Sequence, residues 1–122
     1  MMHTFSKSER FCGQERIRQL YQTGAHFVVW PLRITYHRTD DGKSEVLLWA
    51  SKSLFKHAVD RNRIRRQMRE CYRLQKHIVS DKGIGYQLAI NYISKEKESF
   101  AEIYRSMQRA LLRLSEESKG GL

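Results

Sequence analysis

The sequence predicts an α+β domain with the element order αβββαβα, and three observations lead to this prediction. Helical and strand-like hydrophobic periods alternate along the 122 residues. Hydrophobic residues make up 40% of the chain, which is enough for one modest core, and one proline and seven glycines interrupt the pattern. A chain of this length is expected to form one domain rather than two. We therefore expect residues 1–122 to form a single two-layer domain, with helices packed on one sheet.

A short helix is expected first, over about residues 13–22. Apolar residues recur there at helical spacing, and Gly24 follows at the point where the helix should end. Ser6 and Glu9 have the spacing of a capping box. Residues 1–12 are treated as an N-terminal segment ahead of this helix.

Three strands are expected next. Residues 25–29 and 32–38 are rich in β-branched and aromatic residues, and Pro31 separates them. Residues 39–43 have turn composition, and residues 45–51 read as a returning strand, so the second and third strands are predicted to form a hairpin.

The second half predicts a long helix, a strand and a closing helix. Residues 57–78 contain no glycine or proline and have a helical period, and residues 86–93 read as a strand. Ser99 and Glu102 form a capping box ahead of an amphipathic helix. Residues 118–122 are expected to be a flexible tail.

The positive charge is concentrated in the long helix and the segment before it. The chain carries a net charge of +10, and residues 52–76 contain nine basic and two acidic residues, so this stretch holds seven of the ten net charges. Such a field attracts polyanions and is screened by salt. Nucleic acid is the leading partner class, and an anionic membrane is the second.

Helical geometry divides the long helix into two faces. The apolar face holds Ile64, Met68, Cys71, Tyr72, Gln75 and Ile78. The opposite face holds Asn62, Arg65, Arg66, Arg69, Arg73 and Lys76. A solvated surface with ordinary pairs, Asp60 with Arg63 and Arg66 with Glu70, is the simpler interpretation, but it leaves seven cations unmatched. Arginine binds phosphate oxygens through two parallel hydrogen bonds, so phosphate recognition is favoured.

Other classes of protein fit less well. No window approaches the ~18 apolar residues of a membrane span, and no secretory signal is visible at the N-terminus, so we expect a cytoplasmic protein. Cys12 and Cys71 are then expected to be unpaired thiols. The apolar face is too narrow for a helix that lies on a membrane. The basic helix follows strands rather than forming a helix-turn-helix, which argues against a DNA regulator.

Residues 51–73 closely resemble the signature of the bacterial ribonuclease P protein subunit. The matching core is Ala58-Val59-x-Arg61-Asn62-Arg63-Ile64-x-Arg66-x-x-Arg69-Glu70. The resemblance extends over most of the chain and includes the element order and Gly24. It implies a fold like that of ribosomal protein S5 domain 2, with a left-handed βαβ crossover around the basic helix.

The resemblance also implies a function. In this family a large RNA with bound Mg²⁺ removes the 5′ leader of precursor tRNA, and the protein contacts that RNA and the leader without performing the hydrolysis. This agrees with the sequence, because the five histidines are scattered and Asp40-Asp41 reads as a turn, so no metal site is expected in the protein. No membrane and no obligate protein partner are expected. A general RNA-binding or ribosomal-type protein is the alternative, and a protein-only nuclease would need an acidic cluster that is not visible.

The resemblance assigns the candidate site residues. It implies RNA contacts for Lys52, Arg61, Asn62, Arg63, Arg65, Arg66 and Arg69. Lys56 and Arg73 are added as RNA-binding candidates because they belong to the same basic stretch. The leader is expected in a cleft between the basic helix and the sheet, where side chains stack on or bond an extended strand. The leader positions are Tyr21, Phe27, Arg33, Thr35, Tyr36 and Ser53. Tyr21, Phe27 and Tyr36 also fit core positions, so both roles stay open at this point.

Two departures from the family pattern stand out. Ile17 lies where many members have an aromatic residue, and Thr35 where a tyrosine is frequent, with Tyr36 one residue away. The segment Ser53-Leu54-Phe55-Lys56 is one residue longer than the usual linker and replaces its glycine with bulkier residues. These departures bear on the turn into the basic helix and on contacts from Ser53.

Overall fold

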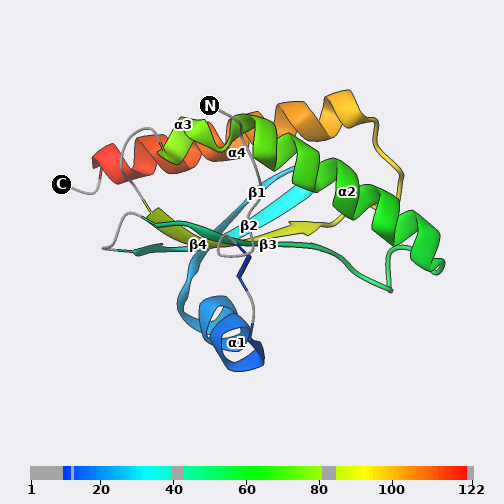
Figure 1. Cartoon of the computed structure of the whole chain (residues 1–122), viewed down its shortest axis with the longest axis horizontal. Helices are drawn as coiled ribbons and strands as arrows, with labels where there is room; N and C mark the ends of the chain where they lie inside the picture. The colour runs from blue at the N-terminus through cyan, green and yellow to red at the C-terminus, as the bar shows by residue number, and fades with distance from the viewer. Residues whose placement is uncertain (1–9, 12, 40–42, 81–84, 121–122) are drawn as a thin grey trace.

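The computed structural model describes residues 10–11, 13–39, 43–80 and 85–120, and it confirms the predicted order of the main elements (Figure 1). The elements are α1 (Gln14–Thr23), β1 (Ala25–Val29), β2 (Leu32–Thr39), β3 (Glu45–Ala50), α2 (Ala58–Gln75), α3 (His77–Ser80), β4 (Gly85–Tyr92) and α4 (Phe100–Gly120). One difference is that the expected helix over 57–78 ends at Gln75 and is followed by the separate short helix α3. Another is that α4 continues to Gly120, three residues into the expected tail.

The four strands form one sheet in the order β1-β2-β4-β3. β1 and β2 pair antiparallel, β2 and β4 pair antiparallel, and β3 and β4 pair parallel. The predicted hairpin of β2 and β3 is therefore wrong, because β4 lies between them. Turn residues show that the chain reverses but not which strands pair, and β4 takes the centre because it has buried residues on both faces.

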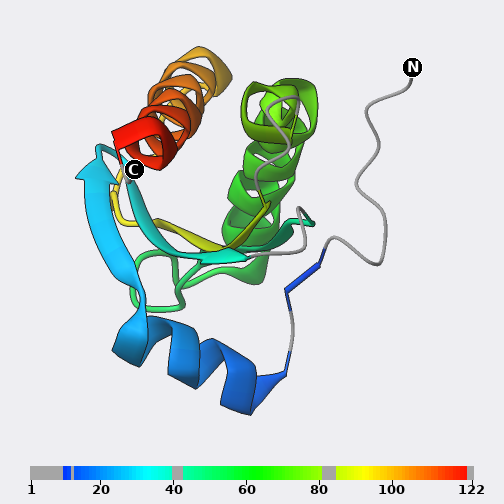
Figure 2. The ribbon, with the colours of Figure 1, turned by 90° about the vertical axis from the view of Figure 1, so that its left-hand side faces the viewer.

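The parallel strands β3 and β4 are joined through α2 and α3, which gives the βαβ unit that the family resemblance implies. The left-handed sense of this crossover stays a prediction. Figure 2 shows α2 and α4 above the sheet and α1 below it. The expected two layers are thus the sheet and the α2–α4 pair, and α1 adds a partial cover on the other side.

The face of the sheet under α2 and α4, here called the closed face, carries the main core. Alternate residues of β2, β3 and β4, such as Ile34, Leu48 and Ile90, point into it and are buried. From α2 it receives Ile64, Met68, Cys71, Tyr72 and Gln75, as predicted, while Ile78 is partly buried. The Cys71 thiol is free, and burial raises its pKa to about 12, so it remains protonated at neutral pH. Cys12 lies outside the described residues.

The face on which α1 lies, here called the open face, has a smaller core of Phe11, Leu20 and Ala89. The backbone N–H of Phe11 donates to the carbonyl of Val46 at 2.9 Å, so residues 10–11 lie along the edge of β3. α1 begins after Gly13 with no side-chain cap, and Ser6 and Glu9 lie outside the described residues. In contrast, α4 has the predicted cap, since the Glu102 N–H donates to Ser99 Oγ at 3.2 Å.

Gly24 ends α1 as predicted, but for a different physical reason. Its backbone is extended rather than left-handed, and its N–H donates to the Leu20 carbonyl at 2.8 Å. A Cβ atom at this position would lie 2.6 Å from the Leu20 oxygen and 2.8 Å from the Tyr36 oxygen. Glycine is needed because the end of α1 passes directly against β2.

Candidate RNA interface

The helix α2 presents its basic side to solvent because its apolar side packs on β3 and α4. The basic face of α2 comprises Asn62, Arg63, Arg65, Arg66, Arg69 and Arg73. Asn62, Arg63, Arg66 and Arg69 are exposed, while Arg65 and Arg73 are partly buried. Three exposed arginines on successive turns give guanidinium groups that can reach phosphates along one strand or on two.

The two acidic residues of α2 do not form the pairs that spacing predicts. Asp60 pairs with Lys97 at 2.9 Å instead of Arg63, and Glu70 pairs with Arg73 instead of Arg66. Hydrogen bonds from these partners lower the pKa of both carboxyl groups. Within the described part of the chain, Arg63 and Arg66 have no ion-pair partner, so the acidic residues leave them available for phosphate groups. Arg73, by contrast, is engaged by Glu70.

Arg61 differs from the other arginines of the motif because its side chain turns back toward the chain. Its Nη1 donates to the carbonyl of Phe55 at 2.8 Å and to that of Lys56 at 3.2 Å. Arg61 therefore has a structural role in addition to its predicted contact with RNA: its side chain holds the linker against the start of α2.

The linker itself turns on Ser51 and is anchored by Phe55. The Ser51 and Ser53 hydroxyl oxygens are 2.8 Å apart, and the Leu54 N–H donates to the Ser51 carbonyl at 3.2 Å. Phe55 is buried, with its ring centre 5.9 Å from that of Tyr92. The bulkier residues of the longer linker thus fill core space, and Lys52, Ser53 and Lys56 remain exposed beside the basic face.

The structure changes the location of the expected cleft. Core side chains fill the space between the sheet and α2. An extended RNA strand therefore does not fit between the basic helix and the sheet. Uncovered sheet surface lies on the open face beside α1, where Arg33 is exposed and its register neighbours are Val28 and Asn91. Tyr21 of α1 is 43% exposed, and its hydroxyl donates to Asn91 Oδ1 at 2.8 Å. Tyr21 and Arg33 therefore occupy the accessible surface that their predicted role requires.

Three other predicted leader positions are not on that surface. Phe27 is buried on the closed face, with the Arg113 guanidinium 4.2 Å above its ring. Tyr36 is partly buried between Phe27 and Tyr86, at ring-centre distances of 5.8 and 6.0 Å. Thr35 is on the α1 side but only 2% exposed. For Phe27 and Tyr36 the core interpretation holds, because strand alternation directs both side chains inward. The burial of Thr35 was not anticipated, and it removes this residue from the accessible surface.

Trp49 is a candidate that the sequence reasoning missed. It is 44% exposed and lies beside Asn91 in the register of β3 and β4. The Arg65 guanidinium carbon is 5.4 Å from the centre of the indole ring, so α2 reaches the open face around the β3 edge. The signal was present in the alternation of β3, since Val46, Leu48 and Ala50 point to the core and leave Trp49 on the opposite face.

The described residues do not offer a metal site. No group of three or more His, Cys, Asp or Glu side chains in the described ranges is arranged to hold a metal ion. The donor set for Mg²⁺ is carboxylate and carbonyl oxygen, and the interface is built from arginine and aromatic side chains that do not fit such an ion. In the part of the chain that the structure describes, no helix is long and apolar enough to cross a membrane.

Comparisons with known proteins agree on one family. The family model described as Ribonuclease P matches residues 5–115. The chain is 36% identical over 117 residues to the ribonuclease P protein component of Porphyromonas gingivalis, covering 90% of this chain and 85% of that one. It is 32% identical over 134 residues to the corresponding protein of Chlorobium phaeobacteroides, covering 94% and 92%.

Solved structures show the same fold. The RNase P protein of Thermotoga maritima superposes with a TM-score of 0.74 at 16% identity, covering 86% of this chain and 96% of that one. A Staphylococcus aureus RNase P protein mutant with defective mRNA degradation activity also gives 0.74, at 17% identity and 90% coverage of both chains. The α+β architecture with its four-stranded sheet is therefore shared with these proteins.

Proposed function

This chain belongs to the ribonuclease P protein family, and from that premise we propose that it is the protein subunit of a ribonuclease P that removes the 5′ leader of precursor tRNA. One observation carries the proposal: the basic face of α2 continues around the β3 edge, through Arg65 and Trp49, onto the open face of the sheet. A protein with this surface can touch a folded RNA and an extended strand at once. The proposed partners are the catalytic RNA and the precursor tRNA, in the cytoplasm.

The basic face of α2 supplies the electrostatic part of the mechanism. Arg63 and Arg66 lie on the surface and neutralise phosphates where two RNA molecules approach each other, which lowers their mutual repulsion. Arg61 holds the linker that presents Lys52 and Lys56 beside them. The protein thus contributes binding and positioning.

The open face supplies the contact with the leader. Single-stranded RNA is commonly bound by stacking of bases on aromatic side chains and by arginine contacts to the backbone. Trp49 and Tyr21 offer exposed aromatic surface. Asn91, which accepts the hydrogen bond of the Tyr21 hydroxyl, lies between Arg33 and Trp49 in the register of the sheet. The leader is proposed to lie along this surface and to leave it at the β3 edge beside α2.

The chemical step is proposed to belong to the RNA subunit. Mg²⁺ bound by that RNA supplies charge stabilisation and an activated water for hydrolysis. The side chains of this protein position the substrate, and their own positive charges reduce the repulsion between the phosphates of the two RNA molecules. No catalytic residue is assigned in the protein.

The proposal is tested by reconstitution with the cognate RNA at limiting Mg²⁺. We expect the wild-type protein to raise the rate of leader removal. The increase given by the double variant Arg63→Gln/Arg66→Gln is expected to be smaller by a factor of about ten or more. Arg105→Gln/Arg109→Gln on α4, which also removes two exposed positive charges, is the matched charge control and is expected to behave as wild type. A protein that binds RNA but leaves cleavage unchanged is instead a general RNA-binding protein.

A further inference from the structure

An ion pair joins the start of α1 to the first residue of β3. The Arg16 guanidinium donates through Nη1 and Nη2 to the two carboxylate oxygens of Glu45, at 3.0 and 2.5 Å. Two such bonds fix the relative orientation of the groups, which a single contact does not do. The two side chains are 46% and 28% exposed, and pairs this accessible contribute little to stability. The role of the pair is therefore to be sought in geometry.

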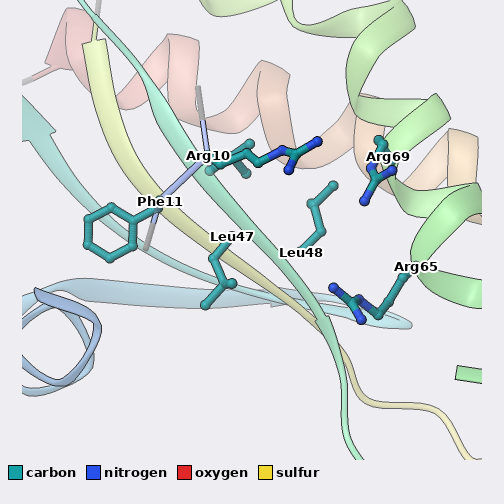
Figure 3. Close-up of a pocket in the computed structure, with 7 residues that line it drawn as sticks. Arg10, Phe11, Leu47, Leu48, Arg65 and Arg69 are labelled. Carbon is teal, nitrogen blue, oxygen red and sulfur yellow. The ribbon is translucent and has the colours of Figure 1, made fainter. Parts of the chain in front are cut away.

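The guanidinium group of Arg16 also lies over the ring of Phe11. Its central carbon is 4.7 Å from the ring centre, and Phe11 is only 2% exposed. The side chain of Arg10 points the opposite way from that ring, into a cavity also lined by two arginines of α2 (Figure 3). Arg16 is thus held by a carboxylate on β3 and by a buried aromatic ring.

The position of Tyr21 depends on the orientation of α1 that this pair sets. Five residues separate Arg16 from Tyr21, which corresponds to about 140° around the helix, so the two side chains lie on opposite flanks of its buried side. The Tyr21 hydroxyl donates to Asn91 at 2.8 Å, and Asn91 is the register neighbour of Trp49. A rotation of α1 would move the Tyr21 ring relative to Trp49, and the bonds of Arg16 to Glu45 oppose that rotation.

Apolar packing opposes this rotation only weakly. In the described part of the chain, α1 contributes Leu20 and the partly buried Ile17 to the core of the open face, and its other residues are exposed. Apolar burial is non-directional, whereas hydrogen bonds have a defined geometry. The directional part of the contact between α1 and the sheet therefore lies in its polar pairs.

From these contacts we propose that Arg16 and Glu45 are positioning residues for the leader, because they hold α1 in the orientation that presents Tyr21 to the RNA. This inference rests on the proposed function and assigns control of leader affinity to a pair that acts through Tyr21. Overall electrostatics and positioning predict opposite results for Glu45. Removal of its negative charge strengthens RNA binding if only the net charge matters, and weakens RNA binding if the pair positions α1.

The first test uses the holoenzyme reconstituted with the cognate RNA and a precursor with a full-length leader. Glu45→Gln is expected to raise the KM about fivefold, as for loss of one weakly stacked base, and to leave kcat unchanged. Glu15→Gln is the matched control, because it removes the same charge from α1 at a residue that pairs with Arg18 and is 83% exposed. Its KM is expected to stay at or below the wild-type value. Equal KM values for Glu45→Gln and Glu15→Gln would overturn the proposal.

A second precursor, with a leader of one nucleotide, separates positioning from a general structural defect. Wild type and Glu45→Gln are expected to have equal KM values for this precursor, since no RNA then lies beside Tyr21. A fivefold difference that persists with the short leader would show that the substitution acts on the fold as a whole, and the positioning role would be wrong.

The third test restores the pair with its charges reversed. Glu45→Arg places two guanidinium groups together and is expected to raise the KM for the full-length leader more than Glu45→Gln does. Arg16→Glu/Glu45→Arg has the net charge of the wild type and an ion pair at the same place, so it is expected to recover most of that loss. A double variant with a KM no lower than that of Glu45→Arg would contradict the role of the pair.

Failure of this inference and failure of the proposed function give different results. If the wild-type protein does not increase cleavage of the full-length precursor by the cognate RNA, the proposed function is wrong and the positioning role falls with it. If the wild type increases cleavage and Glu45→Gln does so with the same KM, the function stands and only the positioning role is wrong.

Discussion

The two faces of the sheet are covered to very different extents. The closed face packs against α2 and α4 in one continuous core that includes Ile34, Ile90 and Met107, all fully buried. Among the described residues, the open face is covered by α1 and Phe11, with a core of Phe11, Leu20 and Ala89. Trp49, Val28 and Tyr21 remain substantially exposed there. The comparison indicates that the two faces have different roles: the closed face provides stability, and the open face is proposed to provide surface for RNA.

The largest loss of stability is expected from a substitution that creates a cavity in the core of the closed face. Ile90 is fully buried in the central strand β4, so Ile90→Ala should lower the free energy of unfolding by about 2–5 kcal/mol through lost burial and the cavity left behind. Val28→Ala on the open face, where the side chain is 51% exposed, should change it by less than about 0.5 kcal/mol. Urea unfolding measures both variants, and similar losses would contradict the contrast between the faces.

A smaller loss of stability is expected where α1 joins the open face. Gly24→Ala places a Cβ atom against the carbonyl oxygens of Leu20 and Tyr36, and relief of this clash must shift α1 or β2. We expect a loss of about 1–3 kcal/mol. Thr23→Ala, at an exposed helical position, is the control for changes at the end of α1. If Gly24→Ala is as stable as this control, the close approach of α1 to β2 does not require glycine.

Removal of the exposed indole should affect binding rather than folding. Trp49→Ala is expected to weaken the binding of single-stranded leader RNA by about 1–3 kcal/mol, because stacking of a base on an aromatic ring contributes that much. Fluorescence anisotropy with a labelled leader measures the affinity, and Val28→Ala serves as a control for loss of apolar surface. Unchanged RNA affinity together with a large loss of stability would place Trp49 in the structural core instead.

The smallest effect is expected at the rim of the closed face, from Asp60. Its hydrogen bond with Lys97 lowers its pKa below the ordinary value of 3.8, so the folded state favours the charged carboxylate. The resulting stabilisation is present above that ordinary pKa and is lost as the pH falls through the lowered one. The stability difference between wild type and Asp60→Asn should therefore be small at pH 7 and disappear once the pH lies below the lowered pKa. A difference that grows on acidification would contradict the pairing.

Local patterns in the sequence predicted the elements well, while contacts between distant residues were harder to predict. The ends of β1 and the start of β3 were placed correctly, because hydrophobic alternation is a local property. The hairpin of β2 and β3 was wrong, because the pairing of β3 with β4 depends on a strand 40 residues later in the chain. The buried face of α2 was also predicted correctly, because it depends on helical spacing, which is a local property too.

The candidate site shows the same limit. The exposure of Arg66 and Arg69 followed from the helical pattern, but the bonds of Arg61 to the Phe55 and Lys56 carbonyls depend on how the longer linker folds. The cavity lined by Arg10, Arg65 and Arg69 depends on Arg10 and Phe11 lying beside β3, which no local period indicates.

The salt dependence of leader binding tests the central claim most directly. If about six phosphates are contacted by the basic face of α2 and the open face, the slope of log affinity against log salt for a single-stranded leader should be roughly −4 for the wild type. Arg63→Gln/Arg66→Gln should reduce its magnitude by about 1.4, while Arg105→Gln/Arg109→Gln leaves it unchanged. A wild-type slope near zero, or equal slopes for the double variant and wild type, would show that these arginines do not contact RNA.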